Sequence, residues 1–335
     1  MLHIIKGTNI RFLDFAKPAF IASWLLIVVV VMLPLWLMPV PRLWRGVSLG
    51  VFAAAATLAT LQGPERGAAL EAGEVAITLL DVGDGTALLV RTAQHTLVYD
   101  TGESFETEGQ RVESVITPAL AAYGRGRVDA LVLSRAHGSR AAGAAHLGVQ
   151  SPRQTVLFGG AWPGSPRGAR SCATPRRWVW DGVRFSVFTA PLPEASCVLH
   201  IDAGAPARVL LAERLDAAEG AALLRRDAAQ AGQWPIRAEI ALAPRRGSPG
   251  ALGPGFTAAV AARDVLVSSR SLDATRRDRI AALWGVPPER LRGTAGEGAI
   301  ELRLRGGVPT LIEAYAPSLS QRLWRWSPHE ANTLR

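Results

Sequence analysis

The sequence predicts an α+β protein, in which a sandwich of two β-sheets with helices outside follows a pair of apolar helices. Two uncharged apolar runs, residues 18–41 and 46–64, lie near the N-terminus. From about residue 75, short runs rich in β-branched and aromatic residues alternate with turns and with a few helical patterns. No GxGxxG turn is present, so many short strands with few helices favour a two-sheet sandwich over a dinucleotide-binding sheet.

The two apolar runs predict a transmembrane helical hairpin after a short N-terminal segment, residues 1–17. The run over 18–41 is long enough to cross a bilayer, whose core needs about 20 apolar residues in a helix. It also exceeds the roughly 7–15 residues of a signal-peptide core, and a second run follows it. The run over 46–64 is richer in alanine, so a buried soluble helix is the alternative to a second span. Residues 65–75 are predicted to be a linker.

The sandwich domain is predicted over residues 76–315, and residues 316–335 form a tail that contains Arg and Trp. Helical spacing of apolar residues predicts helices at 111–123, 216–226 and 271–283. The runs predicted as strands are 75–80, 86–91, 95–99, 128–133, 154–158, 178–188, 196–201, 207–211, 236–243, 264–268, 291–292 and 299–304.

The charge balance is basic, with 37 Lys and Arg against 28 Asp and Glu and a formal net charge of +9. A basic balance favours nucleic acid or anionic lipid as a partner. It fits equally well a GC-rich coding sequence, which raises Arg and Ala together. The positive residues around the two apolar runs slightly favour both ends in the cytoplasm, but the difference is too small to decide the orientation.

Acidic, glycine-rich turns follow two of the predicted strands. They read Leu80-Asp-Val-Gly-Asp-Gly85 and Tyr99-Asp-Thr-Gly102. Such residues allow tight turns and satisfy nearby N–H groups. We predict this structural role for Asp81, Gly83, Gly85, Asp100 and Gly102.

A third turn follows the strand that ends at residue 133, and reads Ser134-Arg-Ala-His-Gly-Ser-Arg-Ala-Ala-Gly143. Taken in order, the three turns resemble the metallo-β-lactamase-like domain at the C-terminal end of the ComEC family of DNA-internalisation competence proteins. The resemblance extends over most of the chain, the two apolar runs included. It implies a metallo-β-lactamase-like αββα sandwich preceded by membrane spans.

The resemblance also implies that the family's two-metal site has been lost. In the family the third turn reads Ser-His-x-Asp-x-Asp-His-x-Gly-Gly, and later turns supply a bridging aspartate and a Pro-His-His-Gly-Ser segment. The ligand places are occupied here by Arg135, His137, Ser139, Arg140, Arg214, Arg245 and Arg246.

Arginine is always protonated and offers no lone pair to a metal, and several cations together repel a divalent ion. We therefore predict no metal, no cofactor and no catalytic residue. Glu213 is one residue away from the bridging place, and a slip of one residue is expected to turn its side chain away.

The same arginines suggest a phosphate-binding role. Guanidinium groups bind phosphate well, so Arg135, Arg140, Arg245 and Arg246 are candidate nucleic-acid contacts. The alternative is drift in a disused pocket. Cys172 and Cys197 match places in the competence-family domain, and one disulfide is expected if the domain faces an oxidising compartment; two buried free thiols are the alternative.

The resemblance implies a protein of the bacterial inner membrane that takes part in the uptake of transforming DNA, with its sandwich domain in the periplasm. Expected partners are the membrane, single-stranded DNA and a separate chain that carries the family's remaining spans. Two other functions stay open: a metal-dependent hydrolase or nuclease of the same fold, and a structural interaction module without DNA contact.

Overall fold

The computed structural model describes residues 69–83, 85–102, 112–147, 154–229, 234–248, 250–307 and 311–315. The chain divides into two units, Met1–Ala68 and Ala69–Arg335. The predicted N-terminal segment, both predicted spans, the first part of the predicted linker and the Arg/Trp tail lie outside the described residues. Within the described ranges, no helix combines the length and the hydropathy needed to cross a bilayer.

In the described part of the chain, the first sheet has eight strands in the order β15-β14-β1-β2-β3-β4-β5-β6. Strands β15 to β3 are antiparallel to their neighbours, and β3 to β6 run parallel to one another. The strand bounds are β1 Glu74–Leu79, β2 Leu88–Arg91, β3 Thr96–Tyr99, β4 Ala130–Leu133, β5 Thr155–Phe158, β6 Arg170–Ser171, β14 Ala299–Arg305 and β15 Leu311–Tyr315.

The second sheet, again counted over the described residues, has seven strands in the order β13-β12-β11-β10-β9-β8-β7. Strands β7 to β10 are antiparallel, and β10 to β13 are parallel. The bounds are β7 Arg176–Trp180, β8 Val183–Phe188, β9 Val198–Asp202, β10 Arg208–Leu211, β11 Ile240–Leu242, β12 Asp264–Val267 and β13 Leu291–Gly293.

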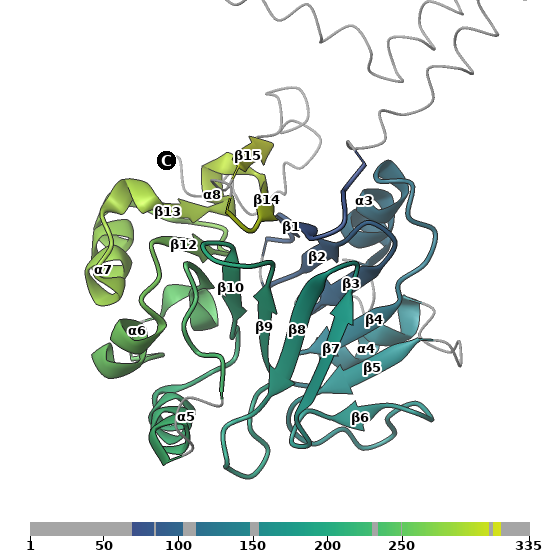
Figure 1. Cartoon of the computed structure of the whole chain (residues 1–335), viewed down its shortest axis with the longest axis horizontal. Helices are drawn as coiled ribbons and strands as arrows, with labels where there is room; N and C mark the ends of the chain where they lie inside the picture. Colours follow the sequence, from purple (N-terminus) through teal and green to yellow (C-terminus); the bar gives the residue numbers. More distant parts are fainter. Residues whose placement is uncertain are drawn as a thin grey trace, which may run out of the picture. The chain divides into compact units, whose positions relative to one another are not determined.

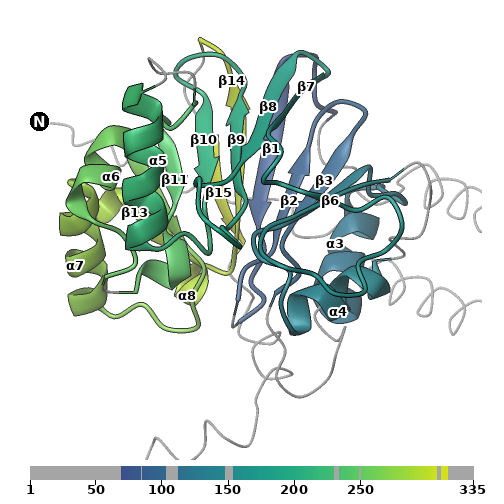
Figure 2. The same cartoon turned by 90° about the horizontal axis from the view of Figure 1, so that it is seen from below.

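The helices cover the outer faces of the two sheets. Figure 2 shows α3 and α4 outside the first sheet and α5, α6 and α7 outside the second, and Figure 1 shows the same elements from the side. The layers therefore run helices, sheet, sheet, helices, which confirms the predicted sandwich with helices outside. The bounds are α3 Thr117–Ala122 after a π-helical turn Val112–Ile116, α4 Ser139–His146, α5 Ala217–Ala229, α6 Pro254–Val260, α7 Ala274–Trp284 and α8 Thr294–Glu297, with 3₁₀ turns at Pro244–Gly247 and Pro288–Arg290.

Both faces of the central strands are buried, which explains their nearly continuous apolar runs. Side chains alternate between faces with a period of two. In β4, Ala130 and Val132 belong to the core between the sheets, whereas Leu131 and Leu133 pack on the helix side. A third cluster, with Val265 of β12 among its members, fills the space under α5, α6 and α7.

The prediction of one strand over residues 178–188 is wrong, because β7 and β8 form a hairpin there. Its two-residue turn is Asp181-Gly182, with φ of 47° and 86°. An Asp-Gly pair accepts positive φ at both turn positions and is a strong hairpin signal. The predicted strand over 236–243 is reduced to β11, and helices α4 and α6 were not predicted.

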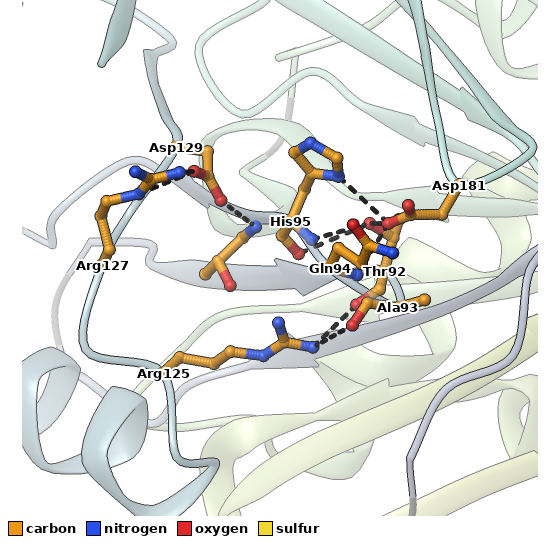
Figure 3. Close-up of polar contacts among 9 residues, drawn as sticks. Thr92, Ala93, Gln94, His95, Arg125, Arg127, Asp129 and Asp181 are labelled. Atoms are coloured by element: carbon orange, nitrogen blue, oxygen red, sulfur yellow. Dashed lines mark hydrogen bonds and ion pairs between the residues drawn. The ribbon is translucent and has the colours of Figure 1, made fainter. Parts of the chain in front are cut away.

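Asp181 connects the two sheets at the end where β3 begins. Its Oδ2 accepts hydrogen bonds from Thr92 Oγ1 at 2.6 Å and Gln94 N at 2.8 Å, and lies 3.1 Å from His95 Nδ1, as Figure 3 shows. Burial alone raises the pKa of Asp181, but these hydrogen bonds lower it further than burial raises it. Nearby, Arg125 donates to the carbonyls of residues 92 and 93.

Candidate functional site

The candidate site lies at the opposite end of the strands, where β3, β4 and β10 finish. Asp100 directly follows β3, has a φ of 56°, and accepts a hydrogen bond at 2.7 Å from the backbone N–H of Ser134, directly after β4. The backbone N–H of Glu213, after β10, donates to Tyr99 Oη at 3.2 Å. These contacts bring the turns of both sheets together in one buried place.

Arg140 provides a positive charge inside this place. Its side chain is 4% exposed, and its Nε lies 3.8 Å from Oδ2 of the fully buried Asp100. Arg140 lies in the first turn of α4. Its carbonyl accepts a hydrogen bond from Thr101 Oγ1, which helps to hold the residue in position. Burial raises the pKa of Asp100, and Arg140 and the Ser134 hydrogen bonds oppose that rise.

The expectation that Glu213 turns away from the site is wrong. Glu213 is 2% exposed, and burial followed by the charge of Asp100 raises its pKa to about 8, against the lowering effect of Arg140. The carboxyl group is therefore mostly protonated at neutral pH. The expectation failed because β10 ends at Leu211, and the alternation of side chains holds only within a strand.

Arg135 links the two halves of the domain. Its Nη2 donates to Glu219 Oε1 at 2.7 Å and to Ser196 Oγ at 3.1 Å. Glu219 lies in the first turn of α5, where its Oε2 accepts from Asp216 N and its own N–H donates to Asp216 Oδ1. This reciprocal capping box fixes the carboxylate that Arg135 binds.

Arg245 and Arg246 lie in the turn after β11, and both have left-handed backbone, with φ of 49° and 60°. Such a conformation costs about 1–2 kcal/mol per residue that is not glycine. Two contacts hold it: Arg245 N donates to the Glu213 carbonyl at 2.6 Å, and Arg276 Nη2 donates to the Arg246 carbonyl at 2.6 Å. The Arg245 side chain is exposed and that of Arg246 is half-buried.

The other predicted positions lie around this centre. Arg214 is half-buried, its carbonyl accepts a hydrogen bond from Ser196 Oγ, and its charge lowers the pKa of both buried carboxyl groups. His137 is exposed, and Ser139 is the first residue of α4.

The glycines in the turns after β1 and β3 adopt positive φ, which glycine accepts without steric strain. Gly83, Gly85 and Gly102 have φ of 73°, 84° and 80°. Gly83 N donates to Asp81 Oδ1, and the Gly85 carbonyl accepts a hydrogen bond from Ser268 Oγ at 2.7 Å. These turns shape the backbone around the buried centre.

A disulfide joins Cys172 and Cys197, whose Cα atoms are 5.6 Å apart. It connects the segment between β6 and β7 to the residue before β9. Cys197 also contacts the site, because its N–H donates to the Ser134 carbonyl at 2.8 Å and its carbonyl accepts from Tyr99 Oη at 3.4 Å. The disulfide therefore stabilises the backbone next to the candidate site.

The donor set does not fit a pair of metal ions. Asp100 and Glu213 supply carboxyl groups, but among the described residues no group of three or more His, Cys, Asp or Glu could hold an ion. Hydrolytic two-metal sites require more ligands and an open position for water. Here the positive charge near the carboxyl groups comes from Arg140 and Arg214.

A comparison with family models finds no match for this chain. Among curated proteins, the chain is 36% identical over 152 residues to the competence protein ComA of Neisseria gonorrhoeae. The resemblance to competence proteins is confirmed over these residues. The match covers 42% of this chain and 20% of ComA, so the chain corresponds to about one fifth of that relative.

Solved structures similar to this chain include a metallo-β-lactamase fold protein and a diphosphatase. The metallo-β-lactamase fold protein YhfI of Bacillus subtilis has a TM-score of 0.44 at 11% identity, covering 68% of this chain and 99% of YhfI. A diphosphatase of the PhnP family has a TM-score of 0.41 at 11% identity, covering 70% of this chain and 98% of that protein.

Sequence reasoning missed the two groups that bind Arg135. Asp216-x-x-Glu219 has the spacing of a capping box, so the role of Glu219 at the start of α5 is visible in the sequence. Its pairing with Arg135, 84 positions earlier, has no local signal. Ser196, 61 positions after Arg135, is likewise brought in only by the fold.

Proposed function

We propose that this chain is an inner-membrane protein of the bacterial DNA-uptake machinery whose metallo-β-lactamase-like domain has no hydrolytic activity. Two findings support the proposal: the similarity to the competence protein ComA and the sandwich of two sheets with helices outside. The domain then contributes by binding and assembly, with the membrane and a chain that carries further spans as partners.

The buried Arg140–Asp100 pair is the observation that carries the loss of activity. A guanidinium group 3.8 Å from the carboxylate places a fixed positive charge where a metal-binding enzyme needs an open coordination position. Removing one partner of a buried ion pair costs about 3–5 kcal/mol, because the other charge is left buried and uncompensated. A divalent cation entering this place would meet repulsion from both Arg140 and Arg214.

The disulfide supports a periplasmic position for the domain. Disulfides persist in oxidising compartments such as the periplasm and are rare in the cytosol. The bond between Cys172 and Cys197 uses both cysteines of the chain. A DNA-binding domain there would meet incoming DNA before the membrane is crossed.

Arg245 and Arg246 are the candidates for DNA contact at the site. Arg135 and Arg140 are bound to Glu219 and Asp100, so their charges are largely neutralised. Arg245 is exposed on a turn whose strained backbone is held by Arg276 and by the Glu213 carbonyl. Strained backbone of this kind is often retained where a loop has a binding role.

The test uses the full-length chain in detergent, with metal analysis, a nuclease assay and binding of labelled single-stranded DNA. We expect less than one equivalent of zinc or manganese, no cleavage, and salt-dependent binding that weakens in Arg245→Ala/Arg246→Ala. The matched control is Arg184→Ala/Arg290→Ala, whose arginines pair with carboxylates at the other end of the domain.

Two results would contradict the proposal. At least one equivalent of bound metal with chelator-sensitive cleavage would establish a hydrolase. Absence of any salt-dependent DNA binding by the unmodified chain would favour a structural module without DNA contact.

A further inference from the structure

A long stretch of this chain contains arginine but no acidic residue. Between Asp129 and Asp181 there is no Asp or Glu, and residues 130–180 contain seven arginines. Arg135 and Arg140 belong to the candidate site described above. Four others, Arg167, Arg170, Arg176 and Arg177, are close together in sequence and form the group that we call the basic edge.

The basic edge lies on one side of the sandwich. β6, which contains Arg170, is the last strand of the first sheet, and β7, which contains Arg176 and Arg177, is the last strand of the second. A short turn connects the two strands, and both views show them on the same side of the domain (Figures 1 and 2). Arg167, Arg170 and Arg177 are exposed, and Arg176 is half-buried.

These arginines differ from two exposed arginines at the end of the sandwich that contains Asp181. Arg184 pairs with Asp202, and Arg290 pairs with Asp264. In contrast, Arg167, Arg170 and Arg176 have no carboxylate partner among the residues that the structure describes. No described carboxylate neutralises the charges of Arg167, Arg170 and Arg176, and such charges favour a polyanion as a partner.

Strand β7 carries Arg177 on the face opposite its tryptophans. Trp178 and Trp180 alternate with Arg177 and Val179, and Val179 is 60% exposed. Both tryptophans pack against the core between the sheets, where Trp178 stacks on Phe185 and Trp180 on His95. The tryptophans therefore hold β7 in place, and its outer face presents Arg177 beside the exposed Val179.

The disulfide fixes the geometry of this edge. Cys172 follows β6 directly, and its bond to Cys197 anchors the turn that leads into β7. The arginines on both strands are therefore presented with a defined spacing. A preorganised surface loses less entropy when it binds an extended chain.

We propose that the basic edge binds the phosphate backbone of nucleic acid. Guanidinium groups form charge-assisted hydrogen bonds to phosphate oxygens, and no acidic residue of the stretch opposes them. The surface is separate from the Arg245–Arg246 turn, and it goes beyond the proposed function, which assigns DNA contact to that turn. The proposal depends on charge and exposure and does not require the candidate site to be inactive.

The test measures how tightly the full-length chain in detergent binds a fluorescent oligothymidylate at several salt concentrations. The oligonucleotide has roughly 30 nucleotides, which is longer than common single-strand binding sites. The variant is Arg167→Gln/Arg170→Gln/Arg176→Gln. The matched control, Arg184→Gln/Arg290→Gln/Arg305→Gln, removes three arginines that form ion pairs. Circular dichroism checks that both variants fold.

We expect the basic-edge variant to bind at least tenfold more weakly, and the slope of log K against log salt to fall by about 2, since each lost phosphate contact on a single strand contributes about 0.7. The control is expected to keep both affinity and slope. Unchanged binding by the basic-edge variant, or an equal loss in the control, would overturn the proposal.

Two further experiments distinguish this proposal from DNA binding at the Arg245–Arg246 turn and from binding to lipid phosphate. If Arg245→Ala/Arg246→Ala abolishes binding while the basic-edge variant keeps it, the DNA contact lies at the turn and the basic-edge proposal fails. Vesicles of phosphatidylglycerol test a lipid source of the phosphate. Binding of the chain to vesicles that depends on the same three arginines, without binding to the oligonucleotide, would assign the surface to a membrane and reject nucleic acid.

Discussion

Replacing Glu213 by glutamine is expected to change how the stability of the domain depends on pH. The glutamic acid is buried, and its pKa is raised from an ordinary value of 4.5 to about 8, first by burial and then by Asp100. Glutamine has nearly the same shape and remains neutral at every pH. The Glu213→Gln variant therefore removes one titration and leaves the packing of the site almost unchanged.

The size of the effect follows from the two pKa values. Because the folded-state pKa is raised, the contribution of Glu213 is fully present below pH 4.5 and is lost as the pH rises through 8. At about 1.36 kcal/mol per unit, the total is roughly 5 kcal/mol, of which about 4 kcal/mol falls between pH 5 and pH 9. The variant is thus expected to gain about that much stability relative to the unmodified chain over this interval.

The assay is denaturant unfolding of the full-length chain in detergent, followed by near-ultraviolet circular dichroism, at steps from pH 5 to pH 9. The control is Glu239→Gln, because its hydrogen bonds from Arg208 outweigh burial and lower the pKa of Glu239. The contribution of Glu239 is therefore present at neutral pH and lost as the pH falls, which is the opposite sign. A Glu213→Gln difference that stays constant from pH 5 to pH 9 would refute the reasoning.

Three further outcomes follow from the structure. Arg140→Met is expected to cost about 3–5 kcal/mol, since it leaves Asp100 buried without its cation; Arg140→Met/Asp100→Asn recovers most of this loss in the same unfolding assay. Cys172→Ser/Cys197→Ser is expected to cost about 3.5 kcal/mol for a separation of 25 residues, a difference that a reductant abolishes. Asp181→Asn is expected to lose stability at pH 7, because the folded-state pKa of Asp181 is lowered. This loss shrinks as the pH falls below about 4, and thermal melting at pH 7 and in acid checks it.

Much of the layered fold is visible in the sequence because strands and helices impose their own periods. The apolar run over residues 128–133 predicts the strand that the structure shows as β4, and the acidic start at residue 216 predicts α5. The hairpin at Asp181-Gly182 has a local turn signal in its Asp-Gly pair, which the prediction of one strand over residues 178–188 overlooked. Helix α4 was missed because it has only eight residues, mostly alanine and glycine, and no large apolar side chains whose spacing would predict a helix.

By itself, the sequence determined that arginine occupies five of the seven positions that the resemblance compares with metal ligands. A guanidinium group offers no lone pair to a metal in any fold. Only the tertiary structure decided what those arginines do instead. Arg135 meets Glu219 across 84 positions, and Arg140 meets Asp100 where two parallel strands end. Glu213 points inward because the chain has already left β10. Such contacts depend on how distant turns pack together, and local periodicity carries no information about that packing.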